Sequence, residues 1–309
     1  MDNLDVICTL AQTEAKKFKF GDDRLPWFEI ENNNVVDNGN HQGHDNADRM
    51  GFFCHHLTQH VLSHLPTANT KTRYSIELHD SNSYLDNSYD YSGCMVWAKN
   101  KKDKGVVLIP DPYQLSNYGG TLVKDTSVKT TDKIGFYGST TGSRNPVKNE
   151  RIQTALWSLD HRDIIDCYIT NIVQMSRDTF TSIGDKHERI MHPFIRLDDM
   201  LQYKYLLDIN GNTTSWNRVP QILNSKSVLF KLKGTDMSWY YPLLHDGTHF
   251  VAVNHHNMRS KLAYCRNNPK EMDFIIANAN RFVTSFLKPN HANFYLVSLL
   301  EEIQHLHGK

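Results

Sequence analysis

A short apolar run that ends in a glycine turn is the feature that most limits what this chain can fold into. The run covers residues 205–209, and Asn210-Gly211 follows it directly. A cluster of hydroxyl and amide side chains then extends to Trp216, and a helix-like segment covers 217–223. A strand, a tight turn and a helix start in this order direct backbone N–H groups and the helix dipole toward one point. The segment therefore predicts an anion-binding pocket.

A second segment repeats this layout upstream. Residues 133–137 form a strand-like run, residues 138–142 read Gly-Ser-Thr-Thr-Gly, and a helical pattern begins near Asn149. The turn has neither the Gly-Lys-Ser/Thr ending of a Walker A loop nor the glycine spacing of a Rossmann fingerprint, and a turn of this composition is often only a connection. Two such pockets in one half of a protein nevertheless suggest a binding site for a nucleotide diphosphate.

Two arginines near the second turn favour this interpretation. Arg144 and Arg151 each carry a guanidinium group, which can hold a diphosphate through two parallel hydrogen bonds. The alternative for Arg151 is a solvated side chain in the first turn of a helix. The helix dipole disfavours a cation at that position, so a nearby anion explains Arg151 better.

The composition excludes several broad classes of protein. Apolar residues make up 39% of the 309 residues and charged residues 22%, with 34 basic and 34 acidic side chains. A balanced charge gives no general attraction to nucleic acid or to an anionic membrane surface. The length is sufficient for two domains with separate cores.

Cysteine usage and the apolar runs indicate the compartment. The five cysteines are scattered, and none forms a Cys-x-x-Cys pair, which argues against a disulfide framework or a thiolate zinc site. The first residues contain no apolar core of a signal peptide. No run reaches the roughly 18 apolar residues of a membrane span. These features predict a cytoplasmic protein without a transmembrane segment.

The pattern of expected helices and strands changes near residue 128. Residues 1–70 are expected to be mainly helical, with a loop at 32–48, and short strands are expected at 73–78, 94–98 and 106–109. After a polar stretch at 123–133, strands and helices alternate, which predicts a parallel sheet covered on both faces. Strands are expected at 134–137, 166–172, 204–209, 227–232 and 249–253, and helices at 149–159, 217–223, 240–244, 257–266, 270–287 and 291–306. The predicted domains are 1–128, 129–287 and a C-terminal helix at 288–309.

Several segments occur together in an order that a known family shares. They are Phe136-Tyr137-Gly138 with Arg151 downstream, Tyr203-Lys204-Tyr205 leading into Gly211-Asn212-x-x-Ser215-Trp216, residues 227–231, and Trp239-Tyr240-Tyr241-Pro242 before residues 249–253. In this respect the chain resembles glycosyltransferase family 90. The resemblance is strong over 134–285 and implies an α/β fold of the GT-B type. Two Rossmann-like lobes would enclose a cleft, and the C-terminal helices would pack back.

The resemblance also implies a reaction. Members use a UDP-sugar and invert the anomeric carbon, which here implies transfer of xylose or glucose to a hydroxyl of a glycan acceptor. The donor site of the family maps onto Gly138, Ser139, Thr140, Thr141, Gly142, Arg144, Arg151, Lys204, Asn212, Thr213, Ser215, Trp216 and Arg218. The general base maps onto Asp80, which without the resemblance would be an ordinary turn residue.

Some features differ from the family pattern. Many relatives carry arginine where this chain has Tyr137 and Thr140, so Arg144 or Arg218 is expected to replace a cationic contact.

The chemistry of an inverting transfer, considered without the family, requires one carboxylate near the acceptor hydroxyl and fixed positive charge near the departing diphosphate. A catalytically inactive relative that only binds nucleotide sugar or glycan is the alternative.

No metal or other cofactor is expected. His56, His60 and His64 share one face of an expected helix, but three ligands on one face suit zinc poorly and no acidic partner completes a motif. The chain also lacks an Asp-x-Asp motif for a catalytic divalent ion. Transfer without a divalent metal is therefore the expectation.

Overall fold

The computed structural model describes residues 2–19, 24–37, 46–66, 71–80, 91–120, 122 and 125–307. The chain divides into two compact units, each built from more than one segment. Unit 1 contains residues 1–120, 235–241 and 285–309, and unit 2 contains residues 121–234 and 242–284. No helix in the described ranges is long and apolar enough to cross a membrane.

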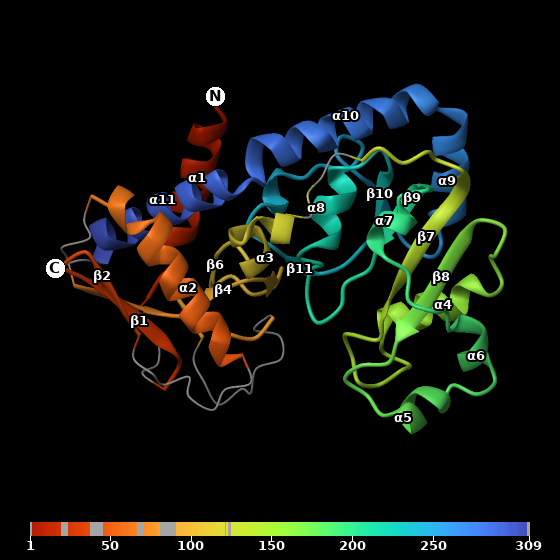
Figure 1. The fold of residues 1–309 in the computed structure, drawn as a ribbon, viewed down its shortest axis with the longest axis horizontal. Helices are drawn as coiled ribbons and strands as arrows, with labels where there is room; N and C mark the ends of the chain where they lie inside the picture. Colours follow the sequence, from red (N-terminus) through yellow and green to blue (C-terminus); the bar gives the residue numbers. More distant parts are fainter. Residues whose placement is uncertain are drawn as a thin grey trace. The chain divides into compact units, whose positions relative to one another are not determined.

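Unit 2 is built on a five-stranded parallel sheet (Figure 1). Its strands are β7 (Thr131–Ser139), β8 (Ile165–Asn171), β9 (Tyr203–Asp208), β10 (Val228–Leu232) and β12 (Val251–Val253). They lie in the order β12-β10-β9-β7-β8. The first strand, β7, therefore lies between the second and the third, and the strand order reverses between β7 and β9. In open α/β sheets, a ligand crevice forms at such a reversal, outside the carboxyl ends of the strands.

The strands of unit 2 are apolar because both faces of the sheet are covered. Phe136, Leu207 and Phe230 are each fully buried in one core cluster. The helices of this unit are α4 (Glu150–Ser158), α5 (Arg177–Thr181), α6 (Lys186–Ile190), α7 (Leu197–Met200), α8 (Arg218–Leu223), α9 (Met258–Asn267) and α10 (Pro269–Phe286), the last of which continues into unit 1. Helices α4 and α6 pack on β8, and α8 packs on β9 and β10.

Most of the elements expected after residue 130 are confirmed. The five strands and the helices α4, α8, α9, α10 and α11 (Pro289–His307) lie within a few residues of the expected ranges. The helix expected at 240–244 is a single 3-10 turn, η4 (Tyr241–Leu243). Helices α5 to α7 were not expected. Each has only four or five residues, too few for a 3.6-residue period to be recognised.

Unit 1 contains three small sheets among its described residues. Strands β1 (Trp27–Glu31), β2 (Asn34–Asp37) and β3 (Thr72–Ser75) form an antiparallel sheet in the order β2-β1-β3. The expectation of a loop from residue 32 onward is therefore wrong for residues 34–37. Asn32 and Asn33 make the hairpin turn with φ values of 52° and 57°, a conformation that asparagine tolerates. Residues 38–45 of the expected loop lie outside the described residues.

The other sheets of unit 1 are shorter. Strand β4 (Met95–Val96) pairs in parallel with β6 (Val107–Leu108), and a parallel bridge joins Ile76 to Met95. Strand β5 (Lys99–Asn100) pairs with β11 (Asp236–Met237). Both units therefore contain parallel strands together with helices, which confirms the expected α/β fold class.

The helices of unit 1 pack on these strands and on one another. They are α1 (Asn3–Ala15), α2 (Ala47–His60), α3 (Pro112–Leu115) and α11, with 3-10 turns η1 (Leu62–His64) and η3 (Asn117–Gly120). Helix α11 packs on α1, so the C-terminal helix does pack back onto the start of the chain. Helix α2 ends at His60, and His64 lies in the separate turn η1. His56, His60 and His64 therefore do not share one α-helical face.

Candidate functional site

The two predicted glycine turns follow the neighbouring strands β7 and β9 and lie against each other. A Cβ atom built on Gly211 would stand 2.7 Å from Thr141 Oγ1, and one built on Gly142 would stand 3.2 Å from Gly211 O. Gly142 also has a φ of 122°, where an L side chain is strained. The Gly142 amide donates to Asn212 Oδ1 at 3.0 Å. Both glycines are needed for this close approach at the β7/β9 reversal.

Arg151 binds the backbones of the two turns together. Its side chain is largely buried, with 9% exposed. Nε donates to the carbonyl of Asn210 at 3.1 Å, Nη2 to the carbonyl of Ile209 at 3.2 Å, and Nη1 to the carbonyl of Ser139 at 3.2 Å. Nη1 also contacts Thr141 Oγ1. The guanidinium thus binds carbonyls from both turns and places a positive charge directly beneath them.

Arg218 supplies a second cation at the same end of the sheet. It is the first residue of α8, and its Nη2 donates to the carbonyl of Tyr137 at 2.7 Å. The guanidinium lies 4.4 Å from the centre of the Phe136 ring. A Cβ atom at Gly138 would stand 3.3 Å from Nη2, so glycine there gives Arg218 its room. Burial lowers the pKa of Arg218, and nearby Asp208 opposes the shift. Its Nη1 is buried and has no hydrogen-bond partner among the described residues.

A buried ion pair lies below Arg218. Asp208, the last residue of β9, is fully buried and accepts from Lys231 Nζ at 2.8 Å. Burial acts to raise the pKa of Asp208, but the charge of Lys231 and its hydrogen bond outweigh burial, and the pKa is lowered. Ser215 and Arg218 contribute to the same shift. Ser215 therefore lies close to a carboxylate that stays ionised.

Asn149 positions the first turn, a role that its place in the sequence does not reveal. It is the N-cap of α4, where its Oδ1 accepts from the Ile152 amide at 3.1 Å. Its Nδ2 donates to the carbonyls of Thr140 and Ser143, each at 2.9 Å. An asparagine at the start of an expected helix is a signal for a cap, but not for the two bonds to the turn. This cap also means that the N-terminus of α4 already has an internal acceptor.

Of two further predicted donor residues, Thr140 lies at the glycine turns and Lys204 does not. Thr140 is buried, and its hydroxyl both donates to the carbonyl of Val173 at 2.7 Å and accepts from the Val173 amide at 2.8 Å, so it holds β7 to the end of β8. Lys204 is the second residue of β9, at the opposite end of that strand from Gly211, and pairs with Asp132 at 3.4 Å. The structure therefore does not bring Lys204 to the glycine turns.

The rest of the predicted donor set follows the turns themselves. The carbonyl of Thr213 accepts from the Gly211 amide at 3.0 Å, which closes the second turn. Trp216 is partly exposed, and Arg144 is exposed in the segment after Gly142. Ser139 and Thr141 contact Arg151 as described above. The structure thus gathers every predicted donor residue except Lys204 along the two turns and the segments that follow them.

Asp80 belongs to unit 1. Its carboxylate accepts from Arg49 Nη2 at 2.8 Å, and Arg49 Nη1 donates to the carbonyl of Leu78 at 2.7 Å. The Asp80 side chain is 29% exposed. Next to it, Glu77 accepts from both the amide and Nδ1 of His79, at 2.8 and 2.5 Å. Helix α2 therefore holds the predicted base through Arg49.

The histidines of α2 have structural partners. His56 is buried, and its Nε2 lies 2.7 Å from Asn293 Oδ1 of α11. Burial lowers the pKa of His56, with a weaker effect of the neighbouring His60 in the same direction. No group of three or more His, Cys, Asp or Glu residues in the described ranges is arranged to hold a metal ion.

Comparison with solved structures finds many weak likenesses. TarM of S. aureus matches with 12% identity and a TM-score of 0.43 over 66% of this chain and 44% of that chain. HepE of Anabaena, solved with UDP, matches with 10% identity and a TM-score of 0.41 over 62% of this chain and 53% of that chain. WaaG, a glycosyltransferase involved in lipopolysaccharide biosynthesis, matches with 10% identity and a TM-score of 0.36 over 66% of this chain and 56% of that chain. The chain thus spans about half the length of these three proteins.

A family model gives a more specific result. No curated protein matches the sequence significantly. The model "Glycosyl transferase family 90" matches residues 138–307, more than half of the chain. The match begins at the first glycine turn and includes the second, the buried pair Asp208–Lys231, and helices α8 to α11. The chain therefore belongs to glycosyl transferase family 90.

Proposed function

We propose that this protein transfers a sugar, xylose or glucose, from a UDP-sugar to a hydroxyl of a glycan acceptor and inverts the anomeric carbon. One observation carries the donor half of the proposal. The two interlocked glycine turns lie at the reversal of strand order in unit 2, where Arg151 and Arg218 place two cations beneath them. A crevice at this point of a parallel sheet, with fixed positive charge, suits the diphosphate of a nucleotide sugar.

The proposed reaction needs charge stabilisation at the leaving group. As the bond between the anomeric carbon and the diphosphate breaks, negative charge develops on the departing oxygen. Arg218 has a buried Nη1 without a partner among the described residues, and the proposal assigns this donor to that oxygen. Arg151 acts from below through its charge, because its N–H groups bind backbone carbonyls. No divalent metal is part of the proposed mechanism.

The proposed base is Asp80. An inverting transfer requires a carboxylate that takes the proton of the acceptor hydroxyl as that oxygen attacks. Arg49 orients the Asp80 carboxylate at 2.8 Å and leaves part of the side chain exposed. The proposal gives Asp80 the proton-transfer role and Arg49 the role of holding it in place.

A screen of nucleotide sugars tests the donor assignment. The purified protein is incubated with UDP-, GDP- and CMP-sugars, and release of the free nucleotide is measured. We expect release with UDP-xylose or UDP-glucose only. Activity confined to GDP- or CMP-sugars would overturn the proposal.

Substitution of Asp80 separates the enzyme from a binding-only relative. In the Asp80→Ala variant, UDP affinity should stay within about twofold of the native value, while transfer should fall at least 100-fold, as expected for loss of a general base. Asp48→Ala is the matched control, because Asp48 is an exposed carboxylate on α2 of the same unit. If Asp80→Ala retains full transfer activity, Asp80 is not the base. If the native protein binds UDP but transfers nothing, the binding-only alternative is correct.

A further inference from the structure

Unit 2 contains a cavity at the end of the sheet opposite to the glycine turns. Its volume is about 270 Å³, which is room for several water molecules. It lies at the amino ends of β7, β9 and β10 and is bounded by the end of α9 and the start of α10. The lining residues are Lys129, Asp132, Lys204, Tyr205, Lys226, Val228, Cys265, Arg266, Pro269, Met272, Asp273 and Ile276. Because the cavity is at the amino ends of the strands, it is separate from the proposed donor site.

The inner wall of the cavity is apolar. Val228 and Cys265 are almost fully buried, Met272 is 6% exposed, and Ile276 packs against the same core. These side chains come from β10, α9 and α10. Such a wall favours binding of an apolar group, because each methylene that leaves water for the wall makes the free energy of binding more favourable by about 0.8 kcal/mol.

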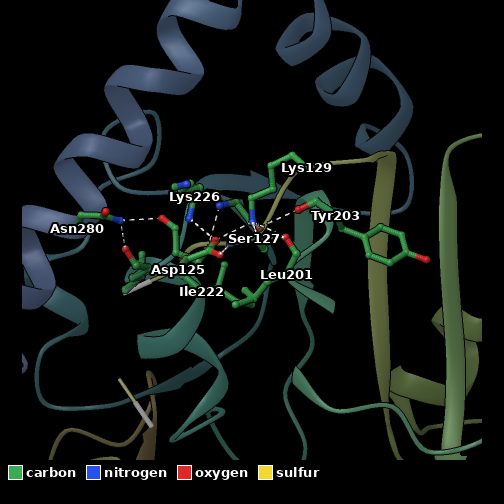
Figure 2. Close-up of polar contacts among 11 residues, drawn as sticks. Asp125, Ser127, Lys129, Leu201, Tyr203, Ile222, Lys226 and Asn280 are labelled. Atoms are coloured by element: carbon green, nitrogen blue, oxygen red, sulfur yellow. Dashed lines mark hydrogen bonds and ion pairs between the residues drawn. The ribbon is translucent and has the colours of Figure 1, made fainter. Parts of the chain in front are cut away.

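Lys129 lines the cavity and forms an ion pair with Asp125, which lies outside the lining (Figure 2). Lys129 Nζ donates to Asp125 Oδ2 at 2.7 Å and to Ser127 Oγ and Ser227 Oγ at 3.1 and 2.9 Å. Asp125 also accepts from the Ser127 and Lys226 amides, each at 2.8 Å. Burial acts to raise the pKa of Asp125, but these bonds outweigh it and lower the pKa to about 2. The N–H groups of Lys129 are therefore used within the protein.

The remaining charges leave one positive charge in excess. Lys204 and Arg266 share Asp132, at 3.4 and 3.2 Å, so this trio carries one net positive charge. The exposed Lys226 adds a second, and Asp273 on α10 removes one. The N-terminus of the 18-residue α10 adds its positive dipole end at the same place.

Tyr205 provides a directed hydrogen-bond donor at the cavity. Its side chain is 4% exposed, and its hydroxyl makes no hydrogen bond with any described residue. Burial raises the pKa of Tyr205 to about 12, with smaller effects of Asp132, Cys265 and Arg266, which all line the cavity. Tyr205 thus lines the cavity, and its hydroxyl remains protonated.

We propose that this cavity binds a small amphipathic monocarboxylate. The apolar body would contact the wall formed by Val228, Met272 and Ile276, and the carboxylate would pair with Lys226 and accept from the Tyr205 hydroxyl. The single negative charge of the ligand matches the one positive charge that remains at the cavity once Asp125, which lies outside the lining, offsets Lys129. The site would be a second ligand site of unit 2, distinct from the glycine turns.

Calorimetric titration with straight-chain carboxylates tests the site. Butanoate, hexanoate and octanoate should bind with one site per chain, and each added methylene should tighten binding up to about fourfold until the cavity is full. Acetate and octanol, which lack the apolar body or the charge, should each bind at least tenfold more weakly than octanoate. Saturating UDP should leave the octanoate affinity within about twofold, which makes the result independent of the proposed donor site.

Two variants locate the binding. Lys226→Met and Tyr205→Phe should weaken octanoate binding about tenfold and about threefold, with unchanged thermal unfolding. Lys186→Met is the matched control, because Lys186 is an exposed lysine on α6 of the same unit. The proposal is wrong if octanoate does not saturate, if octanol binds equally well, if UDP displaces octanoate, or if Lys226→Met and Lys186→Met behave alike.

Discussion

At the scale of single residues, Arg151 shows how one buried side chain can hold a ligand-binding surface in shape. Its three nitrogen atoms donate to carbonyls from the two glycine turns. The sequence suggested a direct phosphate contact, because arginine at a helix start is unusual. It could not reveal these acceptors, since Ser139 is far in sequence from Ile209 and Asn210 and only the pairing of β7 with β9 brings the two turns together.

Arg151→Lys tests this role. Lysine keeps the charge, but it cannot reach carbonyls on both turns at once, because its single ammonium replaces a planar fork of donors. We expect a loss of about 1 to 3 kcal/mol of stability from unpaired buried carbonyls, and a UDP affinity lowered at least tenfold.

Arg177→Lys serves as the control for this prediction, because Arg177 is an exposed arginine on α5 of the same unit and is not among the predicted donor residues. Thermal unfolding and UDP titration of both variants provide the readout. Equal behaviour of the two variants would mean that Arg151 does not organise the turns.

At the scale of elements, the start of α4 is coupled to the first glycine turn through Asn149. One side chain both caps the helix and donates to two carbonyls of the turn. An N-cap can be predicted from residue type and position. The bonds to Thr140 and Ser143 could not, because they depend on how sharply the chain bends after β7.

Two substitutions at position 149 separate these tasks. Asn149→Asp keeps an oxygen for the Ile152 amide but loses the donor to the turn, whereas Asn149→Ala loses both. We expect Asn149→Ala to cost about 1 to 2 kcal/mol of stability and Asn149→Asp clearly less, while both lower UDP affinity. Chemical denaturation and UDP titration measure the two effects. Unchanged UDP affinity in Asn149→Asp would contradict the coupling.

Asp111, at the N-terminus of α3 in unit 1, should make the stability of the folded protein depend on pH. Asp111 caps this helix and accepts from the Gln114 amide at 3.1 Å, yet it is 1% exposed. Burial raises its pKa to about 7, above the usual 3.8, and its backbone hydrogen bonds only partly oppose the shift. The folded state therefore binds a proton more tightly than the unfolded state. This contribution to stability is complete below pH 3.8 and is lost as the pH rises through about 7.

Asp111→Asn should remove this loss, because the amide keeps an oxygen for the cap and carries no charge. We expect the variant to melt at about the same temperature as the native protein near pH 3.8 and a few degrees higher at pH 8, with the difference growing between these two values. Melting curves across this range provide the measurement. A variant that is less stable than the native protein at pH 8 would show that the carboxylate is stabilising when charged.

At the scale of the whole molecule, the predictability of the fold differs between its two halves. After residue 130 the strands are continuous apolar runs bounded by turn residues, and the helices α4, α9, α10 and α11 are long enough for a period to be read. In the first half, β4, β5 and β6 have only two residues each, and the β1–β2 hairpin turns on two asparagines within a polar stretch. Their pairing is set by tertiary contacts, which local pattern does not encode.

The same contrast holds for the candidate site. Sequence pattern located both glycine turns, because strand, turn and helix follow one another locally. It placed Lys204 in the donor set, but register puts this lysine at the other end of β9, where it pairs with Asp132. It also did not identify the buried pair Asp208–Lys231, whose members lie on neighbouring strands.

Hydrogen exchange with and without saturating UDP tests the central claim most directly. If the nucleotide binds at the β7/β9 reversal, amides in residues 138–143 and 210–216 should exchange at least tenfold more slowly in its presence. The amides that line the cavity at the amino ends of the strands should be unaffected. Protection elsewhere in the chain, with none in these two turns, would contradict the account.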